Sequence, residues 1–180
     1  MLWNIWPNFY LVWAPLRLIG DVILFPIYLL TTPFNIAWNL LPHSIKKNTI
    51  KDLEKQVWGL HVHCPEASVP KDGPSAGAAI TLALVSLFTN IPVRNDVALT
   101  GEIDLNGDIL VIGGLEYKIE GGKKAGVTTI CYPEGNAQDI EIVKNTNPEV
   151  LENINLIKVK NIFQVLEICL EPHELKFTRF

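Results

Sequence analysis

Charged side chains are almost absent from the first quarter of this 180-residue chain. Arg17 and Asp21 are the only Asp, Glu, Lys or Arg residues among the first 45, where the aromatic residues are concentrated. Residues 22–45 carry none, and a run of that length exceeds the ~20 apolar residues that cross a bilayer. Residues 1–16 are too short to cross but suit the membrane interface, where Trp and Tyr are favoured. We therefore predict that residues 1–45 are membrane-associated; the alternative is a hydrophobic flap over an incomplete sheet.

Two features limit how this segment is placed. Pro26 and Pro33 would kink or break a helix, and no basic residue precedes the first apolar run, which is atypical of a cleaved signal peptide. Residues 46–56, predicted to be a linker, carry four lysines: Lys46, Lys47, Lys51 and Lys55. Because positive residues favour the cytoplasmic side, a single crossing would leave residues 57–180 facing the cytoplasm.

A phosphate-binding loop ending in Gly-Lys-Ser or Gly-Lys-Thr is also absent, so these residues include no ATPase module of that type. The formal net charge of −4 gives no general attraction to nucleic acid. We therefore expect no nucleic-acid partner, and we expect any catalysis to be independent of ATP unless a separate unfoldase delivers the substrate.

The cysteines are few and odd in number, which argues against a disulfide framework. Cys64, Cys131 and Cys169 each lie in or beside an apolar element, as buried free thiols do in a reducing compartment. A Cys64–His63 dyad is opposed by strand alternation, which points neighbours to opposite faces. His61 and His63 share a face, but no further ligands with a recognised spacing follow. We predict packing roles for both histidines, no metal site and no cofactor.

What the chain does have is a serine at a helix start. Turn formers at 70–74 lead to Ser75, and a small, apolar run over 78–88 predicts a buried helix. Unpaired backbone N–H groups and the positive helix end could there stabilise an oxyanion next to a nucleophile. The alternative is that Ser75 only caps the helix, as serine often does.

A nucleophilic serine needs a base. None of the four histidines, His43, His61, His63 and His173, has an obvious orienting carboxylate in the sequence. A lysine serves when burial or positive neighbours lower its pKa from about 10.4. Lys118 is the best placed, because it follows an apolar strand and the turn at 112–115 and enters the first turn of a predicted helix. Most other lysines lie in polar or paired runs typical of a solvated face.

Three ordered motifs carry a resemblance. Residues 70–77 (PKDGPSAG), 97–103 (VALTGEI) and 112–115 (IGGL) with Lys118 match the nucleophile loop, central strand and base segment of Lon-type proteolytic domains, and Lys118 follows Ser75 at the family spacing of 43 positions. The stretch from His61 to about Leu170 thus resembles the Ser-Lys dyad peptidases that are usually fused to an ATPase. The resemblance implies Ser75 and Lys118 as catalytic residues. It implies supporting roles for Thr100, Asp72, Glu102, Gly73 and Pro74.

The implied fold is α+β, like the second domain of ribosomal protein S5, over residues 57–180. The family normally has further strands and a helix before the strand at 57–63, so the domain is predicted to be truncated at its N-terminal side, with another chain or the N-terminal segment covering the open edge. Asn106-Gly107 predicts a two-residue hairpin, and Gly121 and Gly122 predict a short or irregular base-bearing helix. The remaining patterns predict strands at 57–63, 96–104, 109–112, 127–132 and 154–159, and helices at 136–145 and 162–169.

These features predict an ATP-independent, membrane-associated serine endopeptidase that hydrolyses unstructured polypeptides. Members of the resembled family form rings, to which the ATPase part and the N-terminal strands contribute; without these parts the resemblance leaves a homo-oligomer as one possibility. The alternative is a catalytically inactive binding or assembly module with a membrane anchor.

Overall fold

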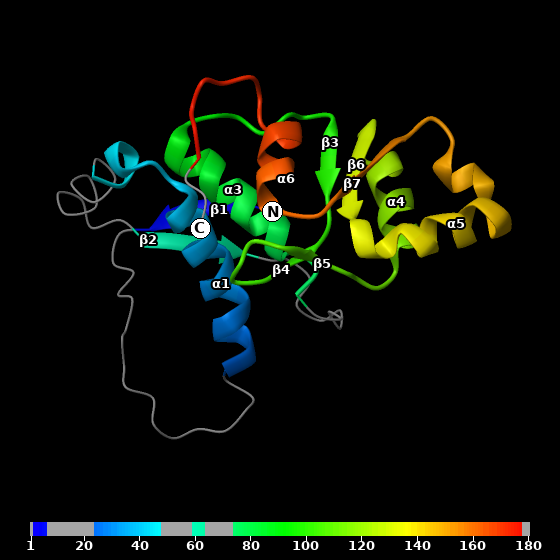
Figure 1. The fold of residues 1–180 in the computed structure, drawn as a ribbon, viewed down its shortest axis with the longest axis horizontal. Helices are drawn as coiled ribbons and strands as arrows, with labels where there is room; N and C mark the ends of the chain where they lie inside the picture. Colours follow the sequence, from blue (N-terminus) through cyan, green and yellow to red (C-terminus); the bar gives the residue numbers. More distant parts are fainter. Residues whose placement is uncertain (1, 7–23, 48–58, 64–73, 178–180) are drawn as a thin grey trace.

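A computed structural model describes residues 2–6, 24–47, 59–63 and 74–177 of the chain (Figure 1). Its centre is a parallel sheet of three strands in the order β3-β6-β7. The strands are β3 (Val97–Leu99), β6 (Thr129–Pro133) and β7 (Asn155–Val159). Because parallel neighbours need crossover connections, helices follow the strands along the chain. They are α4 (Leu115–Lys124), α5 (Ala137–Thr146) and α6 (Ile162–Cys169), with short 3₁₀ helices at η1 (Glu134–Asn136) and η2 (Pro148–Leu151).

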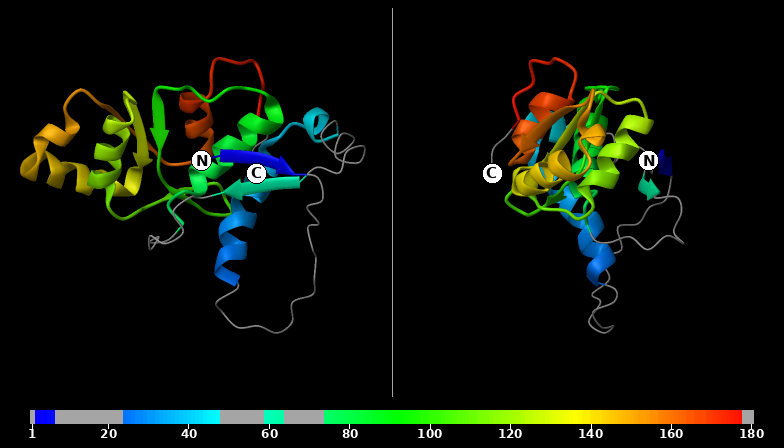
Figure 2. Two further views of the ribbon diagram at one scale, coloured as in Figure 1. Left: turned by 180° about the vertical axis from the view of Figure 1, so that it is seen from behind. Right: turned by 90° about the vertical axis from the view of Figure 1, so that its right-hand side faces the viewer.

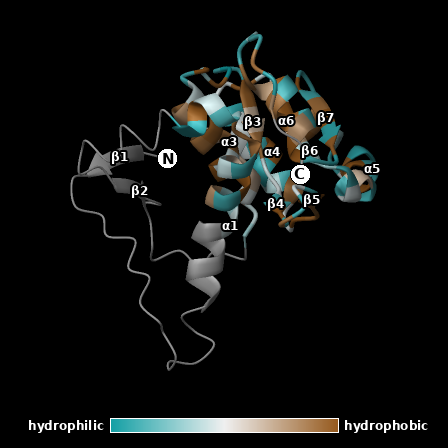
Figure 3. Ribbon diagram, turned by 60° about the vertical axis from the view of Figure 1, so that its left-hand side comes forward, coloured by the Kyte–Doolittle hydropathy of each residue, from teal (hydrophilic) through white to brown (hydrophobic). Residues whose placement is uncertain are grey.

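The middle strand, β6, is buried along its whole length, because it has a partner on each side and helices nearby. Val97 pairs with Thr129, and Thr129 pairs with Asn155, so the three strands begin in register. One apolar cluster lies between α4, α5 and this sheet and includes Ile119, Ile130 and Val143. Figure 3 shows hydrophobic residues running through α3 and β6, with hydrophilic ones on α5.

The larger cluster surrounds α3 (Gly77–Thr89), the helix predicted from the apolar run. On one side it packs against α6, and on another against α1 (Leu24–Leu40). In α1, burial recurs at Ile36, Ala37 and Leu40, the spacing of one helix face. The Phe88 ring meets the rings of Phe34 and Trp38 edge to face, at centroid distances of 6.2 and 6.1 Å. The second half of α1 is therefore part of the core of the domain.

Helix α1 continues through Pro33, and Pro26 lies in its first turn, where the missing N–H has no intrahelical partner to lose. The Pro33 carbonyl oxygen accepts a hydrogen bond from Thr81 Oγ1 of α3, at 3.4 Å. No helix within the described ranges is both long and apolar enough to cross a membrane. The choice between membrane association and a hydrophobic flap for residues 1–45 stays open. The predicted boundaries at 45/46 and 56/57 stay predictions.

The N-terminal strand β1 (Leu2–Trp6) pairs antiparallel with β2 (Gly59–His63), with Leu2 opposite His63 (Figure 2). The predicted strand at 57–63 is therefore confirmed over the residues that the structure describes. β1 and β2 form a sheet of their own, apart from β3-β6-β7, so the prediction that another chain or the N-terminal segment covers an open edge of the domain's sheet stays a prediction.

The expected single strand over 96–104 is wrong. It is two strands, β3 and β4 (Glu102–Ile103), interrupted at Thr100 and Gly101. A side chain at 101 would lie 2.5 Å from the Ile109 methyl group, so glycine lets the chain bend close to the next strand, β5 (Ile109–Leu110). The bend matters for the site described below, since Thr100 and Gly101 contact the start of α3.

The hairpin β4–β5 is confirmed, but its loop is one residue longer than Asn106-Gly107 predicted. Asp104 N–H donates to the Asp108 carbonyl at 3.1 Å, and Gly107 N–H donates to the Asp104 carbonyl at 3.1 Å. Gly107 has a φ of 83°, so the loop is a turn followed by a left-handed glycine, a common three-residue hairpin. The Asp104 carboxylate accepts the N–H groups of Asn106 and Asp108, which stabilises this longer loop.

The predicted irregularity at Gly121 and Gly122 is wrong, because α4 continues through both to Lys124. The two glycines differ in surroundings. Gly121 faces open space, whereas a Cβ at Gly122 would lie 2.8 Å from Ile130 Cδ1. Gly122 therefore allows α4 to lie close against β6.

Candidate active site

Ser75 lies just before α3, but it does not cap the helix. The N-cap position is Ala76, and the first helical amides are bonded elsewhere: Gly77 N–H donates to the Pro74 carbonyl at 2.9 Å, and Ala78 N–H donates to the Gly101 carbonyl at 3.0 Å. The alternative reading of Ser75 as a helix cap is therefore wrong. Ser75 is half-buried and lies beside the positive, N-terminal end of α3, which is largely buried. The hydroxyl oxygen of Ser75 is not used to cap this helix.

The bend between β3 and β4 holds the backbone of this serine. The Ser75 carbonyl oxygen accepts Gly101 N–H at 2.9 Å and Thr100 Oγ1–H at 3.4 Å. A side chain at Gly77 would lie 3.1 Å from Ile103 Cγ2, so glycine is needed where α3 begins against β4. These contacts come from the bend at Thr100 and Gly101 and from β4, and they fix the position of the Ser75 main chain relative to both.

Lys118 is in the first turn of α4, as the sequence predicted. Its helix begins after Gly114, whose φ of 64° is in the left-handed region that glycine adopts without strain. Lys118 Nζ donates a hydrogen bond to the Gly113 carbonyl oxygen at 2.5 Å. The amine is thus folded back over the turn that precedes its own helix.

Ser75, Thr100 and Lys118 line one cavity of about 280 Å³. The three side chains come from the start of α3, the end of β3 and the start of α4, and the remaining walls are apolar: Ala76, Ala79, Ala98, Leu99 and Ile130. Among the described residues, no hydrogen bond joins Lys118 Nζ to Ser75 Oγ; the amine is bonded to the Gly113 carbonyl oxygen. The arrangement places a hydroxyl, an amine and a helix N-terminus around one space, as acyl transfer requires.

The other predicted site residues are placed differently. Pro74 accepts the Gly77 amide and so shapes the turn before α3. Glu102 is on β4, opposite Leu110, and is not among the residues that line the cavity. Asp72 and Gly73 lie outside the described residues.

Two buried cysteines and an ion pair connect the sheet and the segment before β3 to α6. Thr100 N–H donates to the Cys131 carbonyl at 3.2 Å, and Cys131 Sγ lies 3.8 Å from Cys169 Sγ. Both cysteines are free and buried, as predicted; the hydrogen bond with Cys131 and burial raise the pKa of the Cys169 thiol. Cys64 lies outside the described residues.

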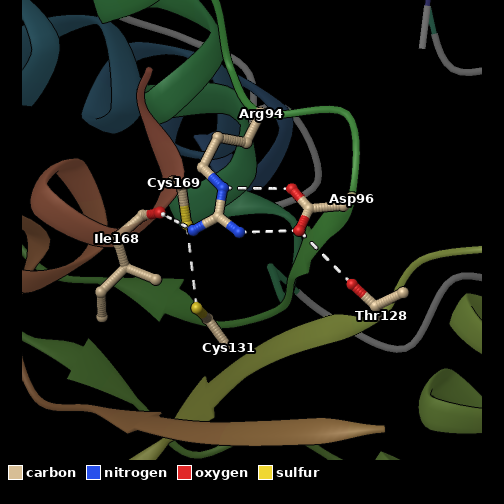
Figure 4. Close-up of polar contacts among 6 residues, drawn as sticks. All are labelled: Arg94, Asp96, Thr128, Cys131, Ile168 and Cys169. Carbon is tan, nitrogen blue, oxygen red and sulfur yellow. Dashed lines mark hydrogen bonds and ion pairs between the residues drawn. The ribbon is translucent and has the colours of Figure 1, made fainter. Parts of the chain in front are cut away.

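The ion pair joins the segment before β3 to two other elements (Figure 4). The Arg94 guanidinium donates two bonds to the Asp96 carboxylate, at 3.1 and 2.7 Å, and a third, at 3.1 Å, to the Ile168 carbonyl. Thr128 Oγ1 donates to the same carboxylate at 3.3 Å. The hydrogen bond from Arg94 holds the pKa of Asp96 below its usual value. The sequence did not single out this group, since its partners come from distant segments.

Sequence reasoning also missed Asn136. This side chain is 3% exposed and binds the backbone of Ile112, in the segment that leads to Lys118. An Asn at the end of a buried strand and the start of a helix was a weak signal, because such a residue is usually an ordinary cap.

The chain was compared with known proteins. Residues 31–172 match the family model of the Lon protease (S16) C-terminal proteolytic domain. Curated relatives include Lon proteases of Orientia tsutsugamushi, 43% identical over 74% of this chain, Fervidobacterium nodosum, 46% over 67%, and Elusimicrobium minutum, 40% over 76%. The matched region spans only 17%, 14% and 16% of these relatives' lengths, respectively.

Proposed function

Because this chain belongs to the family of Lon protease (S16) proteolytic domains, we propose that it is a serine endopeptidase that uses a Ser75–Lys118 dyad. The expected substrates are unstructured polypeptides. The observation that carries the proposal is the shared cavity of Ser75, Thr100 and Lys118, which come from three different elements. We extend the family likeness to an S5-type arrangement of the fold.

In the proposed reaction, Ser75 Oγ attacks the scissile carbonyl carbon while the uncharged Lys118 amine takes the hydroxyl proton. A neutral amine has one lone pair and two N–H donors. The bond from Nζ to the Gly113 carbonyl uses one donor and leaves the lone pair for the proton of Ser75. Lys118 then returns the proton to the leaving amine, and water hydrolyses the acyl-enzyme with the same lysine as base.

The oxyanion must be stabilised by amides other than those of Gly77 and Ala78, since both are bonded within the turn and to Gly101. The backbone next to Ser75, at the positive end of α3, is the nearest source of such donors. The lining includes the apolar residues Ala79, Leu99 and Ile130; a peptide bound against them would displace water and strengthen these interactions.

Peptide hydrolysis by the wild type and by matched variants tests the dyad. A quenched-fluorescent, unstructured peptide should be cleaved by the wild type and left intact by Ser75→Ala and Lys118→Ala. Lys144→Ala is the matched control, because that lysine is exposed and pairs only with Glu141 on α5. Equal turnover in all four proteins would reject the dyad.

Independence from ATP is part of the proposal. The sequence has no Gly-Lys-Ser or Gly-Lys-Thr phosphate loop, so the chain itself is expected to cleave unstructured peptides at the same rate with and without ATP. A folded substrate would need a separate unfoldase. Stimulation of peptide cleavage by ATP in the purified chain would contradict this part.

Membrane association, with the proteolytic domain facing the cytoplasm, rests on the composition of residues 1–45. Carbonate extraction of the full chain tests it. Retention of the full chain in the membrane pellet is the expected result, and its release into the supernatant would contradict this part. Assembly as a homo-oligomeric ring is proposed by family likeness and is checked by light scattering.

A second candidate is a catalytically inactive binding or assembly module with a membrane anchor. The observation in its favour is that Lys118 Nζ is bonded to Gly113 and not to Ser75. If it holds, the wild type binds the unstructured peptide without turning it over, and Ser75→Ala binds equally well. The hydrolysis assay above distinguishes the two candidates.

A further inference from the structure

Asn136 occupies the N-cap position of α5, but its side chain makes no cap bond. Asparagine at this position normally accepts a hydrogen bond from one of the first helical amides. Here the side chain is buried and turned to another part of the chain. Because the Asn136 side chain makes hydrogen bonds to a distant segment and none to the first amides of α5, we expect it to stabilise that distant segment.

That segment is the turn that leads from β5 to α4. Asn136 Oδ1 accepts Ile112 N–H at 3.0 Å, and Asn136 Nδ2 donates to the Ile112 carbonyl at 2.8 Å. The second Nδ2 hydrogen is donated to Asp139 Oδ2. The amide therefore binds both backbone groups of one residue, as a neighbouring strand would, and Asp139 holds the amide in that orientation.

The clamped residue is close to the amine of Lys118. Gly113 follows Ile112 directly, and its carbonyl is the acceptor for Lys118 Nζ. A second contact supports the first, because Gly135 lies so close to Val111 that an added Cβ would be 2.5 Å from Val111 Cγ1. Gly135 and Asn136 of η1 thus contact Val111 and Ile112 of the segment between β5 and α4.

We infer that Asn136 is a positioning residue: it fixes the Ile112–Gly114 turn and thereby the carbonyl that orients the Lys118 amine. This inference rests on the proposed Ser75–Lys118 chemistry. Asn136 lines no part of the cavity and touches no reacting atom. It acts through the backbone, so its loss moves the base without removing a contact to the substrate.

The test compares Asn136→Ala and Asn136→Asp with Asn161→Ala in the full chain. Asn136→Asp keeps the shape and the acceptor for Ile112 N–H, and it turns a carboxylate oxygen towards the Ile112 carbonyl and Asp139 Oδ2, so it breaks the clamp without leaving a cavity. Asn161 is the matched control, since its side chain caps α6 through Gln164 N–H at 3.2 Å, away from the cavity. Circular dichroism confirms that each variant is folded.

Two readouts are measured. With a quenched-fluorescent peptide, both Asn136 variants should lose about 10- to 100-fold in kcat with KM within twofold, as a base displaced by about 1 Å would. Asn161→Ala should keep the wild-type kcat. Amide hydrogen exchange, followed by NMR, should be at least about tenfold faster at Ile112 and Lys118 in Asn136→Ala and at Lys118 in Asn136→Asp, with Thr129 unchanged.

The outcomes separate this inference from the proposed function. An active wild type with unchanged kcat in both Asn136 variants overturns the inference and leaves the dyad in place. An inactive wild type rejects the function, and exchange then decides: faster exchange confined to residues 112–118 supports the clamp, and unchanged exchange there overturns it.

Discussion

The two halves of the cavity are held in different ways. Ser75 precedes α3, in which seven of thirteen residues are buried, and α1 and α6 pack around that helix. Lys118 is on α4, in which only Leu115 and Ile119 of ten residues are buried. Ser75 is therefore positioned by a large apolar core, whereas Lys118 depends on one small cluster and a few polar contacts. A substitution can therefore displace Lys118 more easily than Ser75 without unfolding the protein.

The largest effect that tests this contrast is expected from one large-to-small substitution in α3 and one in α4. Leu84→Ala in α3 and Ile119→Ala in α4 remove side chains that are 1% and 0% exposed. Each should lower the free energy of unfolding by about 2–5 kcal/mol, measured by urea denaturation. The kcat per folded molecule should stay near wild type for Leu84→Ala and fall about tenfold or more for Ile119→Ala, because only the second loosens the base.

Equal kcat losses in these two variants would show that the halves are not held differently. Concentrations of folded protein must be taken from the denaturation curves, since a loss of stability alone lowers the apparent activity.

A smaller effect distinguishes the adjacent glycines of α4. Gly121→Ala should stabilise the protein by about 0.5–1 kcal/mol, because the site is open and alanine favours the helix. Gly122→Ala gains the same propensity but presses on Ile130 Cδ1 at 2.8 Å and Val127 Cγ2 at 3.2 Å. We expect Gly122→Ala to be less stable than Gly121→Ala by about 1–2 kcal/mol, measured by thermal unfolding.

Because Ile130 also lines the cavity, Gly122→Ala should lower kcat while Gly121→Ala leaves it unchanged. If the two variants were equally stable and active, the close packing of α4 on β6 would not hold the base.

The smallest effect concerns pH. The pKa of Asp96 is lowered by the hydrogen bond from Arg94, so the pair stabilises the fold above the unfolded-state pKa of about 3.9. That stability is lost as the pH falls through the lower folded-state value. Asp96→Asn should lower the Tm slightly at pH 7, and the difference from wild type should shrink towards pH 3. A difference that grows on acidification would contradict the assignment.

How much of this could be read from the sequence depends on whether a feature is local. The run over 78–88 predicted α3, and the boundaries of α6 were predicted as found, because periodicity and apolar composition are properties of a short stretch. The break at Thr100 and Gly101 was missed, since an alternating pattern looks the same with or without a bend. The longer hairpin loop was missed because the carboxylate of Asp104 outweighs the Asn-Gly preference.

The same distinction between local features and features that depend on the fold applies to the site. Ser75 and Lys118 were predicted from their positions at two helix starts and from ordered motifs, and the structure places both at one cavity. Asn136 was not found, because its role depends on Ile112, which is 24 positions away and is brought near only by the fold. Composition alone cannot distinguish, for the residues of α1, a membrane-spanning helix from a helix packed on α3, since both need the same apolar side chains.

Covalent labelling of the serine tests the central claim most directly. A fluorophosphonate reacts with a serine hydroxyl that a neighbouring base activates, and mass spectrometry of the peptide that contains Ser75 gives the rate of its modification. The account predicts modification of Ser75 in the wild type and in Lys144→Ala, and a rate at least about 100-fold lower in Lys118→Ala. Equal rates in the wild type and Lys118→Ala would contradict it.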